Sequence, residues 1–316
     1  MEQTEVKDAL TPTSVGGNDA PALEISPAGA GGTVAPQGCP TCGTLSAGVA
    51  VPALPAANSR APSYVYAIGR IEARFPKISV EKEFAQAVGR DKTEGLTDRQ
   101  TLHAVLSKPD NRYLVRQLCW VMTVEGLETY ILVPRDPTDI SLLVEALRPT
   151  PQPGDVDVAI GFRGPIAPPD MCNGLQVPIV AFDKIYSFDR ESLIKAIPAR
   201  EKASAKELAS SAEELFDRIM QMTDNAGSTD QHRALNYLAV RYSRIYEAAH
   251  EAFARNESLT AVEVRPSPLS GTRNVVEVIF SFTHRSTDVV AKQFVRVDVT
   301  DEFPFLVTKL SPYYDR

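Results

Sequence analysis

The amino-acid composition changes abruptly near residue 62, and this change limits what each part of the chain can fold into. Residues 1–62 hold 8 of the 24 prolines and 8 of the 18 glycines, and they contain no aromatic residue. Such a segment buries too little apolar surface to offset the entropy lost on ordering. We therefore expect a disordered leader over residues 1–62, with one local motif, Cys39-Pro-Thr-Cys42-Gly43.

Residues 63–316 show alternating apolar patterns that are typical of a folded α+β domain. Aromatic and β-branched residues are enriched in strand-like runs: YVYAIGRIEARF, both halves of RYLVRQLCWVMTVEGLETYILVP, VDVAIGFRG, VPIVAFDKIYSF, LTAVEVRP, NVVEVIFSFTH and QFVRVDVT. The pair Glu125-Gly126 between two such runs predicts a hairpin turn. The last three runs predict a C-terminal β-meander.

Helical patterns occur before and after these strands. VEKEFAQAVG, DRQTLHAVLS and ISLLVEALR predict short amphipathic helices, and Thr97 is the expected N-cap of the second. Residues 203–256 predict two long helices with one apolar face each, the second beginning at a capping box Ser228-x-x-Gln231. Together they form an antiparallel helical hairpin. Mostly antiparallel strands on both sides of a hairpin, without βαβ alternation, indicate an α+β fold.

Charge and hydropathy exclude two classes of partner. The formal net charge of -7 lacks the basic footprint that phosphate neutralisation needs, so we expect no nucleic-acid partner. No apolar run approaches the roughly 20 residues that span a bilayer, and the N-terminus lacks a basic, then apolar, signal pattern. A cleaved targeting peptide is disfavoured because acidic residues outnumber Lys7 there. We expect a cytoplasmic protein.

Long segments of the chain resemble one known family. They are YVYAIGRIEARFP, SVEKEFAQAVGR, GLTDRQTLHAVLS, NRYLVRQLCWVMTVEGLETYIL, RGPIAPPDMCNG, LFDRIMQMTDNAG, HRALNYLAVRY and FVRVDVTDEFPFLVTKLSPYYDR. These segments are similar to the C-terminal domain of PatG-type cyanobactin maturation proteases. The resemblance extends from about Cys39 to Arg316, so it implies a domain of that type over residues 63–316.

The resemblance implies a pathway but no reaction. Full-length proteins of this type add a subtilisin-like domain that cleaves and macrocyclises ribosomally made peptides, whereas their C-terminal domain is one of unknown function. The sequence shows no glycine-rich motif around a nucleophilic serine. We therefore expect no subtilisin-like protease activity.

The cysteines are the strongest candidates for a metal site. The two-residue spacing of Cys39 and Cys42 allows both thiolates to bind one ion, with Gly43 in the tight turn of a zinc knuckle. Cys119 and Cys172 would complete a closed, structural shell of four thiolates. Alternatively, Cys119 is a core residue, Cys172 is an incidental loop thiol, and the Cys39/Cys42 pair is a redox-active dithiol.

A reducing compartment would keep the four cysteines as thiols or thiolates. The prolines between Gly164 and Gly174 should stiffen the loop that presents Cys172. If zinc binds, it would tie the leader to the folded domain, because metal-binding energy can serve as folding energy.

No motif identifies a catalytic centre. HExxH, P-loop, GxGxxG and GxSxG patterns do not occur in the sequence. The histidines at 103, 232 and 250 fall in helical patterns and His284 ends a strand, so we expect surface or helix-end positions. Carboxylates near strand ends are expected to be solvated or capping residues; they are Asp155, Asp157, Asp183 and Asp189.

Three functions are compatible with these observations. The first is a non-catalytic accessory or recognition protein in cyanobactin-like peptide maturation. It would contain structural zinc, bind a precursor peptide or partner enzymes, and be either a monomer or a homodimer. An exposed meander strand would offer an edge for an extended peptide. The second is a peptide-modifying enzyme that uses zinc or the Cys172 thiol. The third is a scaffold that only drives oligomerisation.

Overall fold

The computed structural model describes residues 63–89, 95–195, 197, 205–221 and 224–314. The expected leader, residues 1–62, lies outside these residues, and so do Cys39 and Cys42. No helix in the described part is long and apolar enough to cross a membrane.

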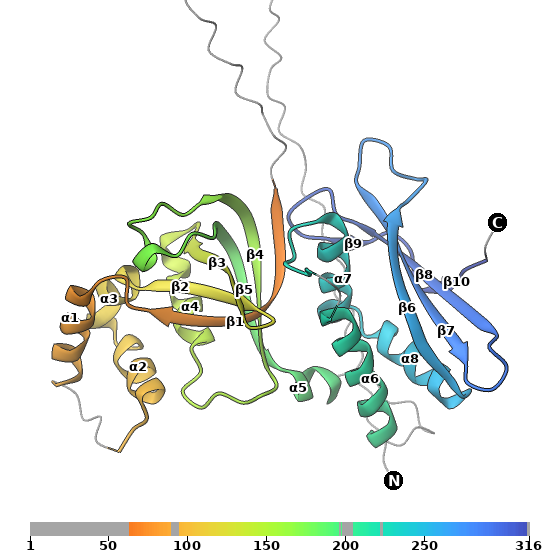
Figure 1. The fold of residues 1–316 in the computed structure, drawn as a ribbon, viewed down its shortest axis with the longest axis horizontal. Helices are drawn as coiled ribbons and strands as arrows, with labels where there is room; N and C mark the ends of the chain where they lie inside the picture. Colours follow the sequence, from red (N-terminus) through yellow and green to blue (C-terminus); the bar gives the residue numbers. More distant parts are fainter. Residues whose placement is uncertain (1–62, 90–94, 196, 198–204, 222–223, 315–316) are drawn as a thin grey trace, which may run out of the picture. The chain divides into compact units, whose positions relative to one another are not determined.

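The first half of the described chain is built around a closed barrel (Figure 1). Its strands are β1 (Tyr64–Arg74), β2 (Cys119–Val124), β3 (Leu127–Pro134), β4 (Asp155–Ile166) and β5 (Pro178–Asp189). They follow the order β1-β2-β3-β5-β4, and β3 and β5 are the parallel pair, whereas the other pairs are antiparallel. Closure leaves this sheet without a free edge.

Four helices pack with the barrel in one apolar core. They are α1 (Ile78–Val88), α2 (Asp98–Leu106), α3 (Arg112–Gln117) and α4 (Ile140–Ala146), with short 3₁₀ turns at Pro109–Asn111 and Pro137–Asp139. Their buried residues, such as Val105 and Leu143, share a cluster with Trp120 and Phe182 of the strands. The predicted N-cap is confirmed, since Thr97 and Gln100 form a reciprocal capping box at the start of α2.

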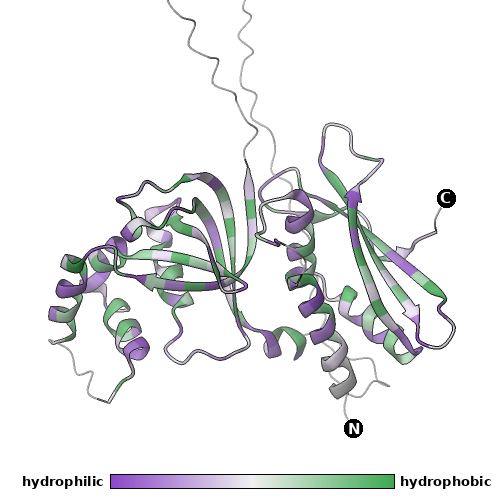
Figure 2. Ribbon diagram, viewed as in Figure 1, coloured by the Kyte–Doolittle hydropathy of each residue, from purple (hydrophilic) through white to green (hydrophobic). Residues whose placement is uncertain are grey.

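The second half packs helices on one face of a C-terminal sheet. These helices are α6 (Ala205–Met220), α7 (Asp230–Arg241) and α8 (Arg244–Ala254), whereas the short α5 (Arg190–Lys195) contacts β5 of the barrel and α6. The strands are β6 (Glu257–Pro266), β7 (Val275–His284) and β8 (Val290–Asp298), with the short β9 (Phe305–Leu306) and β10 (Ser311–Pro312) beside β8. Hydrophobic and hydrophilic residues alternate along the strands of both sheets (Figure 2). The predicted meander and α+β class are confirmed.

Strand β1 contributes to both cores through alternate residues. Tyr66 and Ile68 pack with α6, α7 and the C-terminal sheet. Val65, Ala67 and Ile71 pack inside the barrel core. Successive side chains of a strand point to opposite faces, so one strand can bury both of its faces. This explains why YVYAI reads as a nearly continuous apolar run.

A polar contact fixes β1 to the segment that precedes α7. The amide of Tyr66 donates to the carbonyl of Gly227 at 2.8 Å, and the Asn236 side chain donates to the carbonyl of Tyr66 at 2.8 Å. The side-chain amides of Asn225 and Asn236 bond to each other at 2.8 and 3.1 Å, and both residues are buried. Gly227 has φ of +74°, and a Cβ there would collide with the Tyr66 carbonyl oxygen.

Two details of the sequence prediction are wrong. RYLVRQ is helix α3 and not part of a strand, because Leu114 and Val115 are buried in the barrel core and the Val115 carbonyl accepts from Trp120 Nε1 at 2.9 Å. The second helix of the hairpin is divided into α7 and α8, since Tyr242 leaves helical geometry and its hydroxyl accepts from the Leu310 amide at 3.1 Å.

The start of that second helix also differs from the prediction. Thr229 is the N-cap of α7, and its hydroxyl accepts from the His232 amide at 3.1 Å, in place of the predicted box at Ser228 and Gln231. Threonine and serine are both good caps, and the sequence alone does not distinguish neighbouring positions.

Candidate functional site

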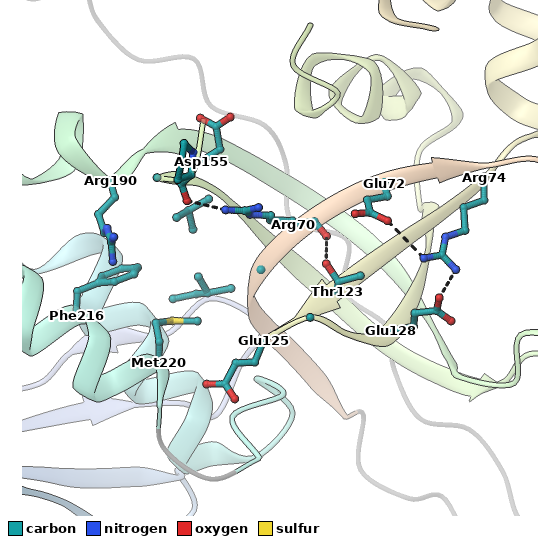
Figure 3. Close-up of a pocket in the computed structure, with 16 residues that line it drawn as sticks. Arg70, Glu72, Arg74, Thr123, Glu125, Glu128, Asp155, Arg190, Phe216 and Met220 are labelled. Carbon is teal, nitrogen blue, oxygen red and sulfur yellow. Dashed lines mark hydrogen bonds and ion pairs between the residues drawn. The ribbon is translucent and has the colours of Figure 1, made fainter. Parts of the chain in front are cut away.

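A cleft of about 590 Å³ runs beside β1 (Figure 3). The turn between β2 and β3 forms one wall, and the segment that leads into β4 forms another. Arg190 of α5 and the α6 residues Phe216 and Met220 complete the lining. The cleft therefore lies where the barrel meets helices of the second half.

Two local backbone features shape this cleft. Gly69 lets β1 cross close to β2, since a Cβ at this position would collide with the Thr123 carbonyl oxygen. Glu125 and Gly126 have φ of +49° and +81° and form the two-residue turn that the sequence predicts. The turn projects the exposed Glu125 side chain at the cleft wall (Figure 3).

Charged side chains of both signs line the cleft. Arg74 forms ion pairs with Glu72, at 3.4 Å, and with Glu128. Arg70 Nη2 donates to the Pro153 carbonyl at 2.6 Å and has no carboxylate partner among the described residues. Arg190 pairs with Asp217 on α6 at 2.6 Å. Figure 3 shows these guanidinium groups along one side of the opening.

A buried network includes Asp155, which lines the cleft. Asp157, 2% exposed, accepts from the Ile71 amide at 2.9 Å and from the Ser187 hydroxyl at 2.7 Å. Arg148 lies 3.4 Å from Asp157 and 3.5 Å from Asp155. Burial raises the pKa of the Asp157 carboxyl. The predicted solvated role of Asp155 and Asp157 is wrong, because both are buried structural ion-pair partners.

The arrangement suits a polar, extended ligand. Guanidinium groups, carboxylates and the apolar Phe216 and Met220 side chains lie within one concave surface. A peptide presents carbonyl acceptors, amide donors and side chains of mixed polarity, and binding sites usually combine apolar walls with a few placed polar groups. The cleft therefore has the chemistry of a recognition site.

The structure brings two of the predicted metal ligands together. Cys119 on β2 and Cys172 in the loop after β4 form a disulfide with a Cα–Cα distance of 5.5 Å. Both are buried, in a small apolar cluster with Ile131 and Ala167. The sequence analysis expects thiols, so the bonded state differs from that expectation. The other two predicted ligands, Cys39 and Cys42, lie outside the described residues.

The backbone around Cys172 has an unusual conformation. Cys172, Asn173 and Gly174 have φ of +51°, +55° and +86°. The Ala167 amide donates to the Val177 carbonyl at 2.9 Å and closes this loop. Non-glycine residues seldom adopt positive φ, and such strain persists only where surrounding contacts enforce it. Within the described residues, no three His, Cys, Asp or Glu side chains are grouped for metal binding.

A second polar cluster contains two neighbouring carboxyls, Asp183 of β5 and Glu302. Arg135 lies 3.0 Å from Asp183 and 3.8 Å from Glu302. Burial and the Asp183 carboxyl raise the pKa of Glu302 from 4.5 to about 7. The sequence indicates Asp183 as a candidate but not Glu302, since the two positions are far apart in the chain and no motif links them.

The histidines occupy the elements that the sequence indicates. His103, His232 and His250 lie on α2, α7 and α8, and His284 is the last residue of β7. The remaining carboxylate candidate, Asp189, accepts from the Ser192 amide at 3.1 Å at the start of α5. This is the capping role that was expected for it.

Comparisons with known proteins agree with this architecture. Residues 202–313 match a family model described as PatG C-terminal. A solved structure titled "PatG Domain of Unknown Function" has a TM-score of 0.65, with 20% sequence identity over 79% of this chain and 98% of that chain. At this identity the likeness shows the fold. Among curated proteins, none matches the chain significantly.

The chain is thus an α+β protein with a closed barrel and a helix-covered C-terminal sheet. Its residues 202–313 are similar to the PatG C-terminal family, in agreement with the resemblance seen in the sequence. The solved structure is titled as a domain of unknown function, so the comparisons supply a similar fold and no activity.

The raised pKa of Glu302 predicts a pH dependence of stability. Between pH 4.5 and about 7 the folded protein keeps a proton that the unfolded chain releases, so the free energy of unfolding falls as pH rises. Glu302→Gln should remove this pH dependence, which changes the free energy of unfolding by on the order of 1 kcal/mol across the interval. Urea unfolding at several pH values measures it. Glu263→Gln, which removes an exposed carboxylate of β6, is the control. An unchanged slope in Glu302→Gln would contradict the assignment.

Proposed function

We propose that this chain is a non-catalytic recognition protein in the maturation of ribosomally synthesised, cyanobactin-like peptides. It binds a precursor peptide, or an extended segment of a partner enzyme, in the cleft beside β1. The observation that carries the proposal is the cleft itself, in one concave surface: Arg70, which has no carboxylate partner among the described residues, exposed Glu125 and apolar Phe216. The PatG C-terminal match supports the pathway.

The cleft suits recognition because its walls belong to regular elements. Gly69 and Arg70 lie in β1, and Phe216 and Met220 lie in α6, so their backbone positions are fixed by strand and helix hydrogen bonds. A preorganised surface loses little entropy when a flexible peptide binds, and the peptide supplies most of the ordering cost. Charge of both signs allows selection between peptides by matching or opposing charges.

Fluorescence anisotropy with a labelled peptide of the cyanobactin-precursor type tests this proposal. Arg70→Ala and Glu125→Lys should each weaken binding roughly tenfold, because a charge-assisted hydrogen bond contributes about 1.5–3 kcal/mol. Arg255→Ala, which removes an exposed arginine next to β6, is the matched control. Binding that is unaffected by both cleft variants, or that is absent for the peptide and for partner enzymes alike, would refute the proposal.

We further propose that the reduced protein binds one structural zinc ion through Cys39, Cys42, Cys119 and Cys172. Two observations support it: the buried Cys119 and Cys172 sulfurs are neighbours, and three consecutive residues at Cys172 have positive φ. Two thiols already paired this closely need little rearrangement to share an ion. Bound zinc would supply folding energy and leave no open position for a substrate.

Metal analysis and thiol counting together test the zinc site. Protein purified under reducing conditions without added metal should contain about one equivalent of zinc, and Cys39→Ser and Cys172→Ser should each lose it. Thiol titration of the unfolded, metal-free protein should then give the four thiols of the sequence. Metal-free wild type with two titratable thiols would show that one disulfide is present, as between Cys119 and Cys172 in the structure, and would contradict zinc binding.

The alternative of a peptide-modifying enzyme receives less support from the described residues. Cys172 is 8% exposed and bonded to Cys119, so its sulfur is not presented as a nucleophile. A mass change in a precursor peptide after incubation with the protein would favour the enzyme. The Cys172 mechanism further predicts that the Cys172→Ala variant produces no such mass change.

A further inference from the structure

The outer face of the C-terminal sheet carries a cluster that the cleft does not involve. Val276, Val278 and Phe280 of β7 face the helices and belong to their core. Glu277 and Ile279 alternate with them and therefore point to the opposite face of the sheet. Both are nevertheless at most 3% exposed. The helices of the described part pack on the other face of the sheet. On this face, long side chains from the neighbouring strands β6 and β8 cover Glu277 and Ile279.

Glu277 is a buried carboxylate held between two arginines. Its Oε1 accepts from Arg296 Nε at 2.9 Å, and Arg296 Nη2 lies 2.8 Å away. Its Oε2 accepts from Arg265 Nε at 3.3 Å, and Ser267 donates to Oε1 at 3.3 Å. Cross-strand register brings these side chains together, since Glu277 is opposite Arg265 on one side and Arg296 on the other. The carboxylate thereby fixes the orientation of both guanidinium groups.

Aromatic and apolar residues form a hollow of about 650 Å³ around the arginines. The rings of Phe294 and Tyr313 meet edge to face at 5.6 Å. Arg265 lies over the Tyr313 ring at 5.0 Å, and Arg296 lies over the Phe294 ring at 4.9 Å. Leu269 and Tyr314, 63% and 80% exposed, lie at the rim. Such apolar side chains rarely stay exposed together without a partner.

The charges of the cluster do not cancel. Arg265 and Arg296 carry two positive charges and Glu277 carries one negative charge, which leaves one positive charge in the hollow. Nη1 of each guanidinium has no intramolecular partner among the described residues. Arg265 Nη2 donates to the Tyr313 hydroxyl, and Arg296 Nε and Nη2 both contact Glu277, so one Nη1 group of each arginine remains to donate to a ligand. A singly charged carboxylate matches the excess charge and offers one oxygen to each Nη1 group. A phosphate dianion would instead add a net negative charge beside the buried Glu277.

We propose that this hollow is a carboxylate-binding site for peptides. Arg265 and Arg296 bind the carboxylate, and the Leu269, Phe294 and Tyr314 side chains contact a neighbouring apolar residue of the same peptide. The C-terminal carboxylate and an acidic side chain share this chemistry. The site lies on elements that contribute nothing to the cleft beside β1, so it does not rest on the function proposed for that cleft.

Three fluorescein-labelled pentapeptides test the proposal by anisotropy. The first ends in leucine with a free carboxylate, the second is its C-terminal amide, and the third is an amide with glutamate before the leucine. At least one carboxylate peptide should bind roughly tenfold more tightly than the plain amide, and the comparison identifies the carboxylate source. Equal binding of all three peptides to the wild type, or no binding, would overturn the proposal.

Variants assign the binding to the arginines. Arg296→Lys and Arg265→Lys keep the positive charge beside Glu277, so they should fold, but they lose the planar fork and should reduce the carboxylate preference several-fold. Arg255→Ala leaves the hollow unchanged and should bind as the wild type does. A preference that persists in both lysine variants would place the carboxylate elsewhere. The result for the cleft variants Arg70→Ala and Glu125→Lys is independent of this outcome.

Discussion

The attachment of α7 to β1 is the interaction on which the rest of the structure depends. The Tyr66 amide donates to the Gly227 carbonyl, and the Tyr66 carbonyl accepts from the Asn236 side chain. The paired side-chain amides of Asn225 and Asn236 are buried around this contact. Buried polar groups that all find partners specify one arrangement, whereas a missing partner leaves a costly unsatisfied group. Because the alternate residues of β1 enter both cores, this contact joins the barrel to the second half as one unit.

The cleft follows from the same contact. Its residues come from β1, the β2–β3 turn, the segment before β4 and α6, so it exists only while the barrel and α6 keep their relative positions. Gly69 permits close approach of β1 to β2, and the buried network around Asp157 includes Asp155, which lines the cleft. The charged cluster on the outer face of the C-terminal sheet arises from cross-strand register, which places Glu277 between Arg265 and Arg296. The proposed peptide contacts thus arise from two separate structural causes.

Local chemistry was sufficient to predict most elements. The apolar run of β1, the Glu125-Gly126 turn and the Thr97 cap each depend on neighbouring residues, and the structure contains all three.

Tertiary contacts determine the features that the sequence does not predict. RYLVRQ has strand-like composition, but burial of Leu114 and Val115 beside Trp120 makes it a helix. The break at Tyr242 depends on its bond to the distant Leu310 amide. The carboxyl pair of Asp183 and Glu302 likewise joins positions far apart in the chain, which no spacing reveals. Cys119 and Cys172, two members of the proposed metal shell, form a disulfide, a bonded state that the expected reducing compartment does not predict.

The most direct test of this account is hydrogen exchange followed by mass spectrometry in increasing urea, comparing amides of β2 in the barrel with amides of β7 in the C-terminal sheet. If β1 joins both cores into one unit, the two strands should become exposed at the same urea concentration. Asn236→Ala should shift both midpoints equally to lower urea concentration and lower the free energy of unfolding by about 2 kcal/mol, because it leaves the Tyr66 carbonyl oxygen and the Asn225 Oδ1 without their shared donor. Separate midpoints, or a variant that destabilises only one of the two strands, would contradict the account.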